Sequence, residues 1–231
     1  MQSLLKHRAF LLAGLLTAGA AGAQEKTGVI DSSYNNGYYR ERVDYFRAMP
    51  DRKNEIIFLG NSITEVGEWQ ELLDMPHVLN RGVSGDNTYG VVARMDEVLA
   101  SHPARIFMLI GVNDIKRGTP QEYILYNYRR IIERVKRESP RTRLYIQSVL
   151  PVAESMLANI YVKITNEKIR VLNDSVRAIA AAAGLTYVDL HNDVFADSQG
   201  QLKKDLSTDG LHLKPMAYLL WVDYLRKKKY L

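Results

Sequence analysis

Aspartate and histidine stand close together near the C-terminus of this chain, at a spacing that could support proton transfer. Asp209 precedes His212 by three residues, with Gly210 between them and Pro215 shortly after. An aspartate placed in this way can accept a hydrogen bond from one imidazole nitrogen while the other nitrogen acts as a base. Taken alone, the segment is more simply a surface loop whose two side chains never meet.

A serine that could act as a nucleophile lies in the sequence GNSIT, residues 60–64. Ser62 follows a short apolar run and precedes sequence with helical character, so it could attack a substrate, bind a phosphate or cap a helix. The pattern is not G-x-S-x-G, which excludes the nucleophile elbow of α/β-hydrolases. It is also not G-x-x-x-x-G-K-[ST], which argues against a nucleotide-binding loop.

Two further polar turns follow apolar runs. Residues 80–88 form a glycine-rich turn that leads into helical sequence, so the backbone N–H groups near Gly85 could face an anion. Residues 111–114 read Gly-Val-Asn-Asp, and Asn113 could offer a side-chain N–H donor. Each turn alone is also consistent with an ordinary tight turn.

The remaining histidines are weaker candidates for chemistry. Asp189, His191 and Asp193 are spaced by two residues each and could ligate a metal, although two carboxylates and one imidazole form a weak pattern. We expect His77 and His102 to be surface residues, since one opens a strand and the other follows a helix.

Alternating strands and helices must position these residues. Short apolar runs predict five strands, at residues 55–59, 77–80, 104–110, 144–150 and 185–190. Helical periodicity and stop signals predict helices at residues 38–49, 88–100, 120–138, 163–183 and 215–229, with an irregular connection at 151–161. Repeated β-α units with right-handed crossovers favour a three-layer α/β/α fold around a five-stranded parallel sheet. Ligands bind outside the carboxyl ends of such strands, and the serine and both polar turns follow strands.

The N-terminus has the pattern of a secretory signal peptide. Lys6 and Arg8 precede an uncharged apolar stretch that ends in Ala21-Gly22-Ala23. The stretch is too short to span a bilayer, so we expect cleavage and no stable membrane insertion. We therefore predict a signal peptide at residues 1–23, a single domain at residues 24–231, and a location in the periplasm or outside the cell.

Composition excludes several classes of protein. The 231 residues include no cysteine, which excludes disulfide frameworks, thiolate nucleophiles, iron–sulfur clusters and cysteine-based zinc sites. The content of 46% hydrophobic and 25% charged residues is that of a globular domain. The formal net charge is +5, but a basic run at residues 226–229 contributes much of it and suits the end of a last helix. We expect no nucleic-acid partner.

Together, four of these segments resemble the sequence blocks of the SGNH (GDSL-like) esterase and acylhydrolase superfamily. They are residues 60–64, residues 81–86, residues 111–114 and residues 209–212. The resemblance spans roughly residues 56–215, most of the chain. The first block departs from the family pattern at Asn61, where the family has Asp, and at Ile63, where it has Leu. Neither position is that of the nucleophile.

The resemblance implies a role for each residue in a flavodoxin-like SGNH fold. Ser62 would be the nucleophile, His212 the general base and then acid, and Asp209 the residue that orients His212. The backbone N–H groups of Ser62 and Gly85 and the side-chain amide of Asn113 would form the oxyanion hole. The resemblance implies neither a metal nor an organic cofactor.

These observations predict an exported serine esterase that acts on small acyl esters. We expect acetyl groups on a carbohydrate as the substrate. One alternative is a lysophospholipase or thioesterase with an acyl-chain groove at residues 151–161, where Val152, Met156, Leu157 and Ile160 are apolar. Alternatives of another class are an inactive glycan-binding module on the same fold and a signalling or interaction domain. The oligomeric state is not determined by the sequence.

Overall fold

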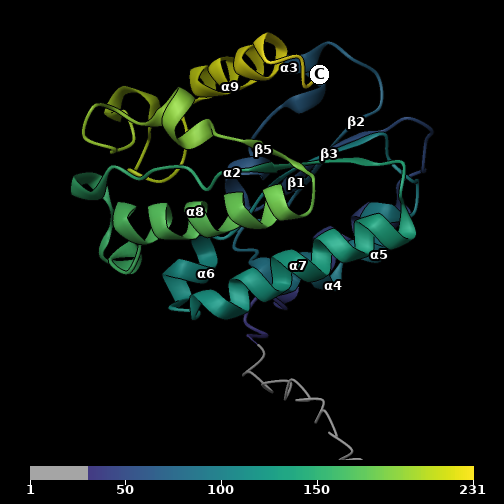
Figure 1. The fold of residues 1–231 in the computed structure, drawn as a ribbon, viewed down its shortest axis with the longest axis horizontal. Helices are drawn as coiled ribbons and strands as arrows, with labels where there is room; N and C mark the ends of the chain where they lie inside the picture. Colours follow the sequence, from purple (N-terminus) through teal and green to yellow (C-terminus); the bar gives the residue numbers. More distant parts are fainter. Residues whose placement is uncertain (1–30) are drawn as a thin grey trace, which may run out of the picture.

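The computed structural model describes residues 31–231, in which five parallel strands form one sheet between two helical layers (Figure 1). The predicted three-layer α/β/α architecture is therefore confirmed. The strand order is β2-β1-β3-β4-β5, and the strands are β1 (Ile56–Gly60), β2 (Val78–Gly82), β3 (Arg105–Leu109), β4 (Arg143–Gln147) and β5 (Thr186–Val188). The predicted signal peptide lies outside the described residues and stays a prediction.

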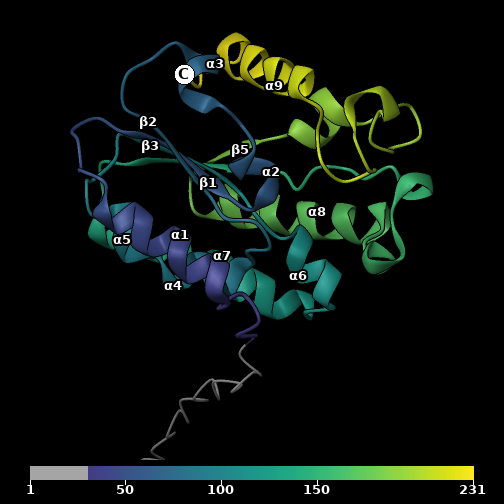
Figure 2. The same cartoon turned by 180° about the vertical axis from the view of Figure 1, so that it is seen from behind.

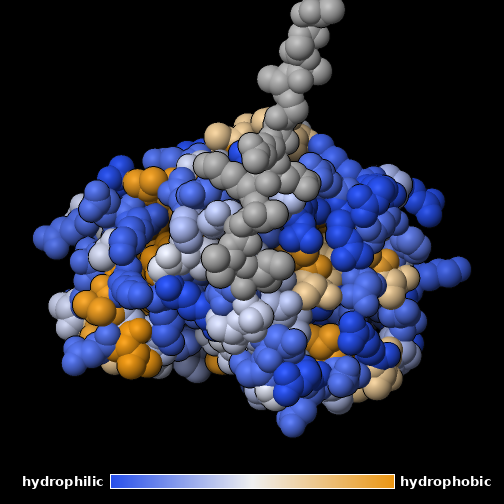
Figure 3. Space-filling model, turned by 90° about the horizontal axis from the view of Figure 1, so that it is seen from below, coloured by the Kyte–Doolittle hydropathy of each residue, from blue (hydrophilic) through white to orange (hydrophobic). Residues whose placement is uncertain are grey.

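The helices divide between the two faces of the sheet (Figures 1 and 2). One face carries α1 (Gly37–Ala48), α4 (Thr88–Ala93), α5 (Met95–Leu99), α7 (Gln121–Glu138) and α8 (Asn166–Ala182). The other carries α3 (Trp69–Leu73) and α9 (Pro215–Lys227), which pack against each other. The side that carries α6 and α7 is mostly hydrophilic, with apolar residues in small scattered groups (Figure 3).

Sequence signals explain where the two long helices begin and end. Pro120 stands at the N-cap of α7, and Pro140 follows its last residues, so neither end can extend. Helix α7 buries Ile124, Tyr128 and Ile131 on one face, as its 3.6-residue period requires. Helix α8 begins three residues later than predicted because the side chain of Thr165 caps it.

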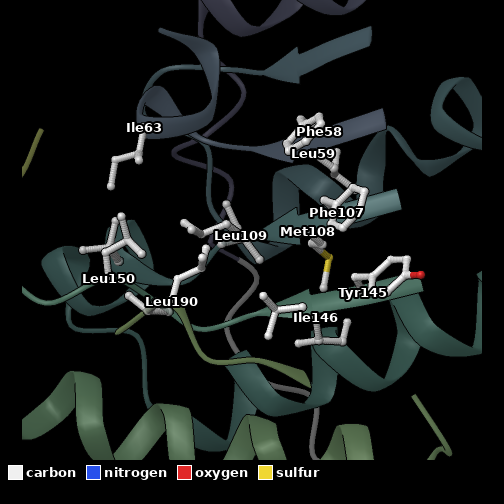
Figure 4. Packing of buried hydrophobic residues seen from close by; sticks show 14 of the residues in the cluster. Phe58, Leu59, Ile63, Phe107, Met108, Leu109, Tyr145, Ile146, Leu150 and Leu190 are labelled. Carbon is white, nitrogen blue, oxygen red and sulfur yellow. The ribbon is translucent and has the colours of Figure 1, made fainter. Parts of the chain in front are cut away.

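A ladder of aromatic rings crosses the centre of the sheet (Figure 4). Phe58, Phe107 and Tyr145 are register partners on β1, β3 and β4, and their rings stack with centroids 5.1 and 4.6 Å apart. Trp69 of α3 stacks on Phe58 at 3.9 Å. Each such contact is worth about 0.5–1.5 kcal/mol beyond burial, so the ladder fixes the register of the strands whose ends carry the polar turns.

One predicted helix is interrupted. Residues 88–100 form two helices, α4 and α5, because the backbone of Arg94 leaves the helical region at φ −112° and ψ 14°. The Arg94 side chain is fully buried and reaches Asp86 and the carbonyl of Gly60, contacts that a residue on an exposed helix face could not make. The prediction of one continuous helix was wrong for this reason.

Short elements at the strand ends complete the structure. Helix α2 (Ser62–Glu65) follows β1, and α6 (Val112–Arg117) follows β3. The connection after β4 contains two single 3-10 turns, Glu154–Met156 and Asn159–Tyr161. Within residues 31–231, no helix is both long and apolar enough to cross a membrane.

We predict that Gly82→Ala destabilises the protein strongly. A Cβ at this position would lie 2.2 Å from the backbone nitrogen of Glu65 and 2.4 Å from its Cα, so α2 and its first residue, Ser62, would have to move. Overpacking of backbone against backbone costs about 2–4 kcal/mol. Chemical denaturation would measure the loss in the free energy of unfolding.

Gly37→Ala is the matched control, because no atom lies within 4 Å of its added Cβ. We expect this variant to stay within about 0.5 kcal/mol of the parent protein. Equal stability of the two variants would contradict the steric argument.

Candidate active site

Ser62, His212 and Asp209 form a continuous chain of hydrogen bonds. The Oγ of Ser62 lies 3.0 Å from Nε2 of His212, and Nδ1 of His212 lies 2.7 Å from Oδ2 of Asp209. Residues separated by 150 positions in the sequence are thus brought together at the carboxyl edge of the sheet. With Nδ1 held by a carboxylate, Nε2 faces the hydroxyl and can accept its proton.

The N-terminus of α2 presents Ser62. Asn61 caps this helix, and its side-chain oxygen accepts a hydrogen bond at 3.0 Å from the N–H of Ile63. The N–H of Ser62 itself makes no hydrogen bond to residues 31–231 and remains available to a ligand. Asn61, which departs from the family pattern, therefore performs a local capping role and leaves the serine in place.

Hydrogen bonds within the loop stabilise the segment that carries Asp209 and His212. The Oδ1 of Asp209 accepts hydrogen bonds from the backbone N–H groups of Leu211 at 2.9 Å and His212 at 2.7 Å. Burial alone would raise the pKa of Asp209, but the side-chain hydrogen bond from His212 and these backbone donors outweigh it and lower the pKa. Asp209 therefore stays ionised and can stabilise a protonated His212.

Gly85 occupies a turn that no other residue type would fit easily. Its φ is +80°, a left-handed conformation that favours glycine, and nothing lies within 4 Å of the position of a Cβ. Its N–H makes no hydrogen bond within residues 31–231. The unpaired N–H of Gly85 and the open space beside its Cα are the features that an anion-binding turn requires.

Asn113 lies in the first turn of α6 and is 7% exposed. One hydrogen of its Nδ2 is donated to the carbonyl of Asp86 at 2.8 Å. That bond fixes the amide plane and leaves the second Nδ2 hydrogen for another acceptor. Asn113 and Gly85, predicted from separate sequence blocks, are thereby linked through Asp86.

A buried ion pair joins two of the four sequence blocks directly, and the hydrogen bond from Asn113 to the carbonyl of Asp86 links a third to them. Arg94 and Asp86 are 0% exposed, and Nε of Arg94 donates to Oδ2 of Asp86 at 2.9 Å. The Nη2 of Arg94 also donates at 3.0 Å to the carbonyl of Gly60, two residues before Ser62. Burial raises the pKa of Asp86 to about 6 despite the opposing effect of Arg94.

Glu65 and Arg117 stabilise the Gly85 turn through hydrogen bonds. Oε2 of Glu65 accepts hydrogen bonds from the N–H of Ser84 at 2.6 Å and from its hydroxyl at 2.5 Å. Arg117 donates to the carbonyl of Gly85 at 2.9 Å. Neither Glu65 nor Arg117 was predicted from the sequence, because both act through helices too short to show periodicity.

Tyr161, from the connection after β4, contacts His212, and Lys116 contacts Tyr161 in turn. The ring of Tyr161 packs edge-on against the His212 ring, with centroids 6.5 Å apart. Lys116 of α6 places its Nζ 4.5 Å from the centroid of the Tyr161 ring. Sequence analysis missed both residues, since nothing in the spacing of the chain relates position 116 to position 161.

The three residues considered for a metal site do not converge. The side chain of Asp189 pairs with Arg177 and Asn192, whereas that of Asp193 accepts from Tyr224 at 2.5 Å. His191 is buried, and burial lowers its pKa. Residues 31–231 contain no group of three potential ligands placed to hold a metal ion. His77 and His102 are exposed, as predicted.

Comparison with known proteins gives one consistent result. The model of the GDSL-like Lipase/Acylhydrolase family matches residues 58–220. Platelet-activating factor acetylhydrolase IB subunit alpha1 of Homo sapiens is 26% identical over 174 residues, which cover 73% of this chain and 72% of that protein.

Solved structures give the same picture. A Streptococcus pneumonia protein provisionally named a platelet activating factor has a TM-score of 0.76 and 32% identity, covering 83% of this chain and 92% of its own. An acetylxylan esterase from Geobacillus stearothermophilus shares the fold, with a TM-score of 0.60 and 17% identity over 77% of this chain and 95% of its own.

Asp114, next to Asn113, provides a test of the buried polar network. It is fully buried and accepts hydrogen bonds from the hydroxyl of Thr88 at 2.6 Å and from its N–H. Burial raises the pKa of Asp114 from 3.8 to about 7. The folded protein therefore holds this proton more tightly than the unfolded chain, and the resulting stabilisation, complete below about pH 4, is lost as the pH rises through 7.

We predict that Asp114→Asn, which cannot ionise, gains stability relative to the parent by about 1–3 kcal/mol on going from pH 5 to pH 8. Denaturation curves at several pH values would measure this difference. Groups common to both proteins, such as His191, cancel in it. Asp174→Asn, at an exposed position on α8, is the control and should show no such trend. A pH-independent difference for Asp114→Asn would contradict the assignment.

Proposed function

Because the chain belongs to the GDSL-like lipase/acylhydrolase family and is an ester hydrolase, we propose that it removes small acyl groups, acetyl groups in particular, from carbohydrates. The observation that carries the proposal is the Ser62–His212–Asp209 hydrogen-bond chain beside the free donors of Ser62, Gly85 and Asn113.

In the first half of the proposed reaction, Oγ of Ser62 attacks the carbonyl carbon of the ester while Nε2 of His212 takes its proton. The carbonyl oxygen becomes an oxyanion, which accepts hydrogen bonds from the N–H groups of Ser62 and Gly85 and from Nδ2 of Asn113. His212 then gives the proton to the leaving alcohol, and the acyl group remains on Ser62.

In the second half, water replaces the alcohol. His212 takes a proton from the water as it attacks the acyl carbon, and the proton returns to Oγ of Ser62 when the carboxylic acid leaves. Ionised Asp209 stabilises the imidazolium at both stages. The chain's own residues supply every proton transfer.

The packing of the connection after β4 supports a short acyl group. Of the four apolar side chains that could have lined a groove for a long chain, Val152 is 0% exposed, and Met156 and Leu157 are partly buried against the core. Only Ile160, at 67% exposure, is free. A lysophospholipase or thioesterase would need these side chains at its groove, whereas here three of the four pack into or against the core.

The acetyl part of the proposal is supported by the human relative, which is named an acetylhydrolase. The carbohydrate part is supported by the acetyl xylan esterases that share the fold of this chain. The export predicted from residues 1–23 would bring the enzyme to polysaccharides outside the cytoplasm. A glycan-binding module without activity would need neither a serine aligned with a histidine nor an ionised aspartate behind it.

The first prediction from this proposal concerns acyl-chain length. We expect the purified protein to hydrolyse p-nitrophenyl acetate with the highest kcat/KM in a series that runs to the decanoate, and Ser62→Ala to lose at least about 10³-fold in kcat. A steady-state assay with circular dichroism of the variant would measure this. A preference for long chains would favour the lysophospholipase or thioesterase alternative, and no activity in folded parent protein would favour the binding module.

The second prediction concerns the oxyanion donor on α6. Asn113→Ala should lower kcat by about 10²–10³-fold with little change in KM, since the lost hydrogen bond forms in the transition state. It should also lower the free energy of unfolding by about 1–3 kcal/mol, because the carbonyl of Asp86 loses its donor.

Asn127→Ala separates these two effects. Asn127 is equally buried and donates to Thr88 Oγ1 at 3.0 Å, but it lies on α7. This variant should lose similar stability and keep kcat within about threefold. A similar loss of kcat in both variants would show that Asn113 acts only through the fold.

A further inference from the structure

The face of α6 that carries Asn113 also carries two cations. Lys116 and Arg117 follow Asn113 by three and four residues, and side chains at these spacings lie on the same side of a helix. Arg117 is occupied, because it donates to the carbonyl of Gly85 and lies 3.8 Å from a carboxylate oxygen of Asp31. Lys116 makes no hydrogen bond or ion pair with any group in residues 31–231.

Tyr161 links Lys116 to the catalytic histidine. Its ring lies under Nζ of Lys116 at 4.5 Å and edge-on to the His212 ring at 6.5 Å. In the proposed reaction, His212 gives a proton to the leaving alcohol, so the alcohol must lie against His212. In this reaction Tyr161, which contacts His212, would lie beside the alcohol part of the substrate, with Lys116 next to Tyr161.

The electrostatic environment of Lys116 lacks a negative partner. Lys116 is partly buried, and burial followed by the charge of Arg117 lowers its pKa. Nζ of Lys163 approaches the same end of α6, 3.5 Å from where a Cβ of Gly118 would stand. A partly desolvated cation among like charges is unfavourable unless an anion joins it.

We propose that Lys116 binds an anionic group, a carboxylate or a phosphate, on the alcohol part of the ester, and that the ring of Tyr161 supports this part of the substrate. The substrate class is thereby narrowed from acetylated carbohydrates to acetylated acidic sugars. A charge-assisted hydrogen bond to the anion completes the coordination of Lys116, and a sugar ring packs its apolar C–H face on an aromatic ring. This inference rests on the proposed esterase function.

Aryl acetates of different charge test the inference directly. The substrates are phenyl acetate, 4-acetoxybenzoate, 4-acetoxyphenyl phosphate and 4-acetoxyphenyl-trimethylammonium. The variants are Lys116→Met, which keeps the length of the side chain and removes the charge, Lys116→Arg, which keeps the charge, and Tyr161→Leu. Lys53→Met is the control, because Lys53 is an exposed lysine outside the carboxyl edge of the sheet, in the segment that leads into β1.

The quantity of interest is kcat/KM for each charged ester divided by that for phenyl acetate, compared with the same ratio in the parent protein. This comparison removes differences in chemical reactivity among the esters. In Lys116→Met we expect the ratio for the two anionic esters to fall about two- to fivefold, mainly through KM, and the ratio for the cationic ester to rise. Lys116→Arg and Lys53→Met should keep the parent ratios, and Tyr161→Leu should raise KM for every ester.

Salt provides a second readout. The advantage of the anionic esters in the parent protein should shrink between 0.05 and 0.5 M sodium chloride, because the Debye length falls well below the size of the site. The carboxylate and phosphate esters differ in charge, so their relative ratios show which oxyanion Lys116 prefers. Ratios in Lys116→Met that equal those of the parent for both the anionic and the cationic esters would overturn the inference.

Binding to Ser62→Ala separates failure of this inference from failure of the proposed function. Calorimetry would measure the affinity of this variant for 4-acetoxybenzoate, with and without the additional change Lys116→Met. Binding that depends on Lys116, with no hydrolysis by the parent protein, would overturn the esterase proposal and keep the anion site. Hydrolysis of every ester by parent and Lys116→Met alike, with no binding that depends on Lys116, would overturn the anion site and keep the esterase proposal.

Discussion

The buried ion pair between Arg94 and Asp86 is the constraint on which the site depends. It links the carbonyl that ends β1, the turn of Gly85 and, through the carbonyl of Asp86, the amide of Asn113. A charge without exposure to solvent needs its partner, and loss of one member of such a pair costs about 3–5 kcal/mol. This ion pair adds to the pairing of β1 with β2, in which the N–H of Val83 also donates to the carbonyl of Gly60, and so helps to hold the three segments in one arrangement.

Burial also raises the pKa of two carboxylates toward neutral pH, to about 6 for Asp86 and about 7 for Asp114. Asp86 has a cation beside it, whereas Asp114 has the neutral donors of Thr88 and of its own backbone, and the nearby charge of Asp86 raises the pKa of Asp114 further. Both carboxylates lie in the sequence blocks that form the site. These buried carboxylates fix the segments that carry the proposed oxyanion donors, but their ionisation lowers the stability of the protein near neutral pH. Preorganised sites commonly combine these two effects.

The sequence predicts the layers, the parallel sheet and the five residues whose spacing matches the family blocks, because apolar strands, helix stops and short polar motifs are local signals. It misses what depends on contacts between distant segments. Arg94 reads as one more residue of a helix, and only its fully buried position explains why residues 88–100 form two helices. Glu65, Arg117 and Tyr161 escape notice for the same reason, since their partners are the turns of other strands. The possible metal site at Asp189, His191 and Asp193 shows the opposite case. These residues are close in sequence, but Asp189 pairs with Arg177 and Asp193 accepts a hydrogen bond from Tyr224.

Different segments of the chain supply the residues of the proposed mechanism and those proposed to contact the alcohol. The residues of the proposed mechanism lie in the first turns of α2 and α6 and in a loop where Asp209 accepts hydrogen bonds from the backbone of its own loop. The segment proposed to lie beside the alcohol comes from the irregular connection after β4, where Tyr161 packs partly against the core and its neighbours Ile160 and Val162 are exposed. Under the proposed function, a change in that connection would alter which alcohol is accepted without moving Ser62 or His212. Lys116 is then the point at which the connection meets α6, the helix that carries Asn113.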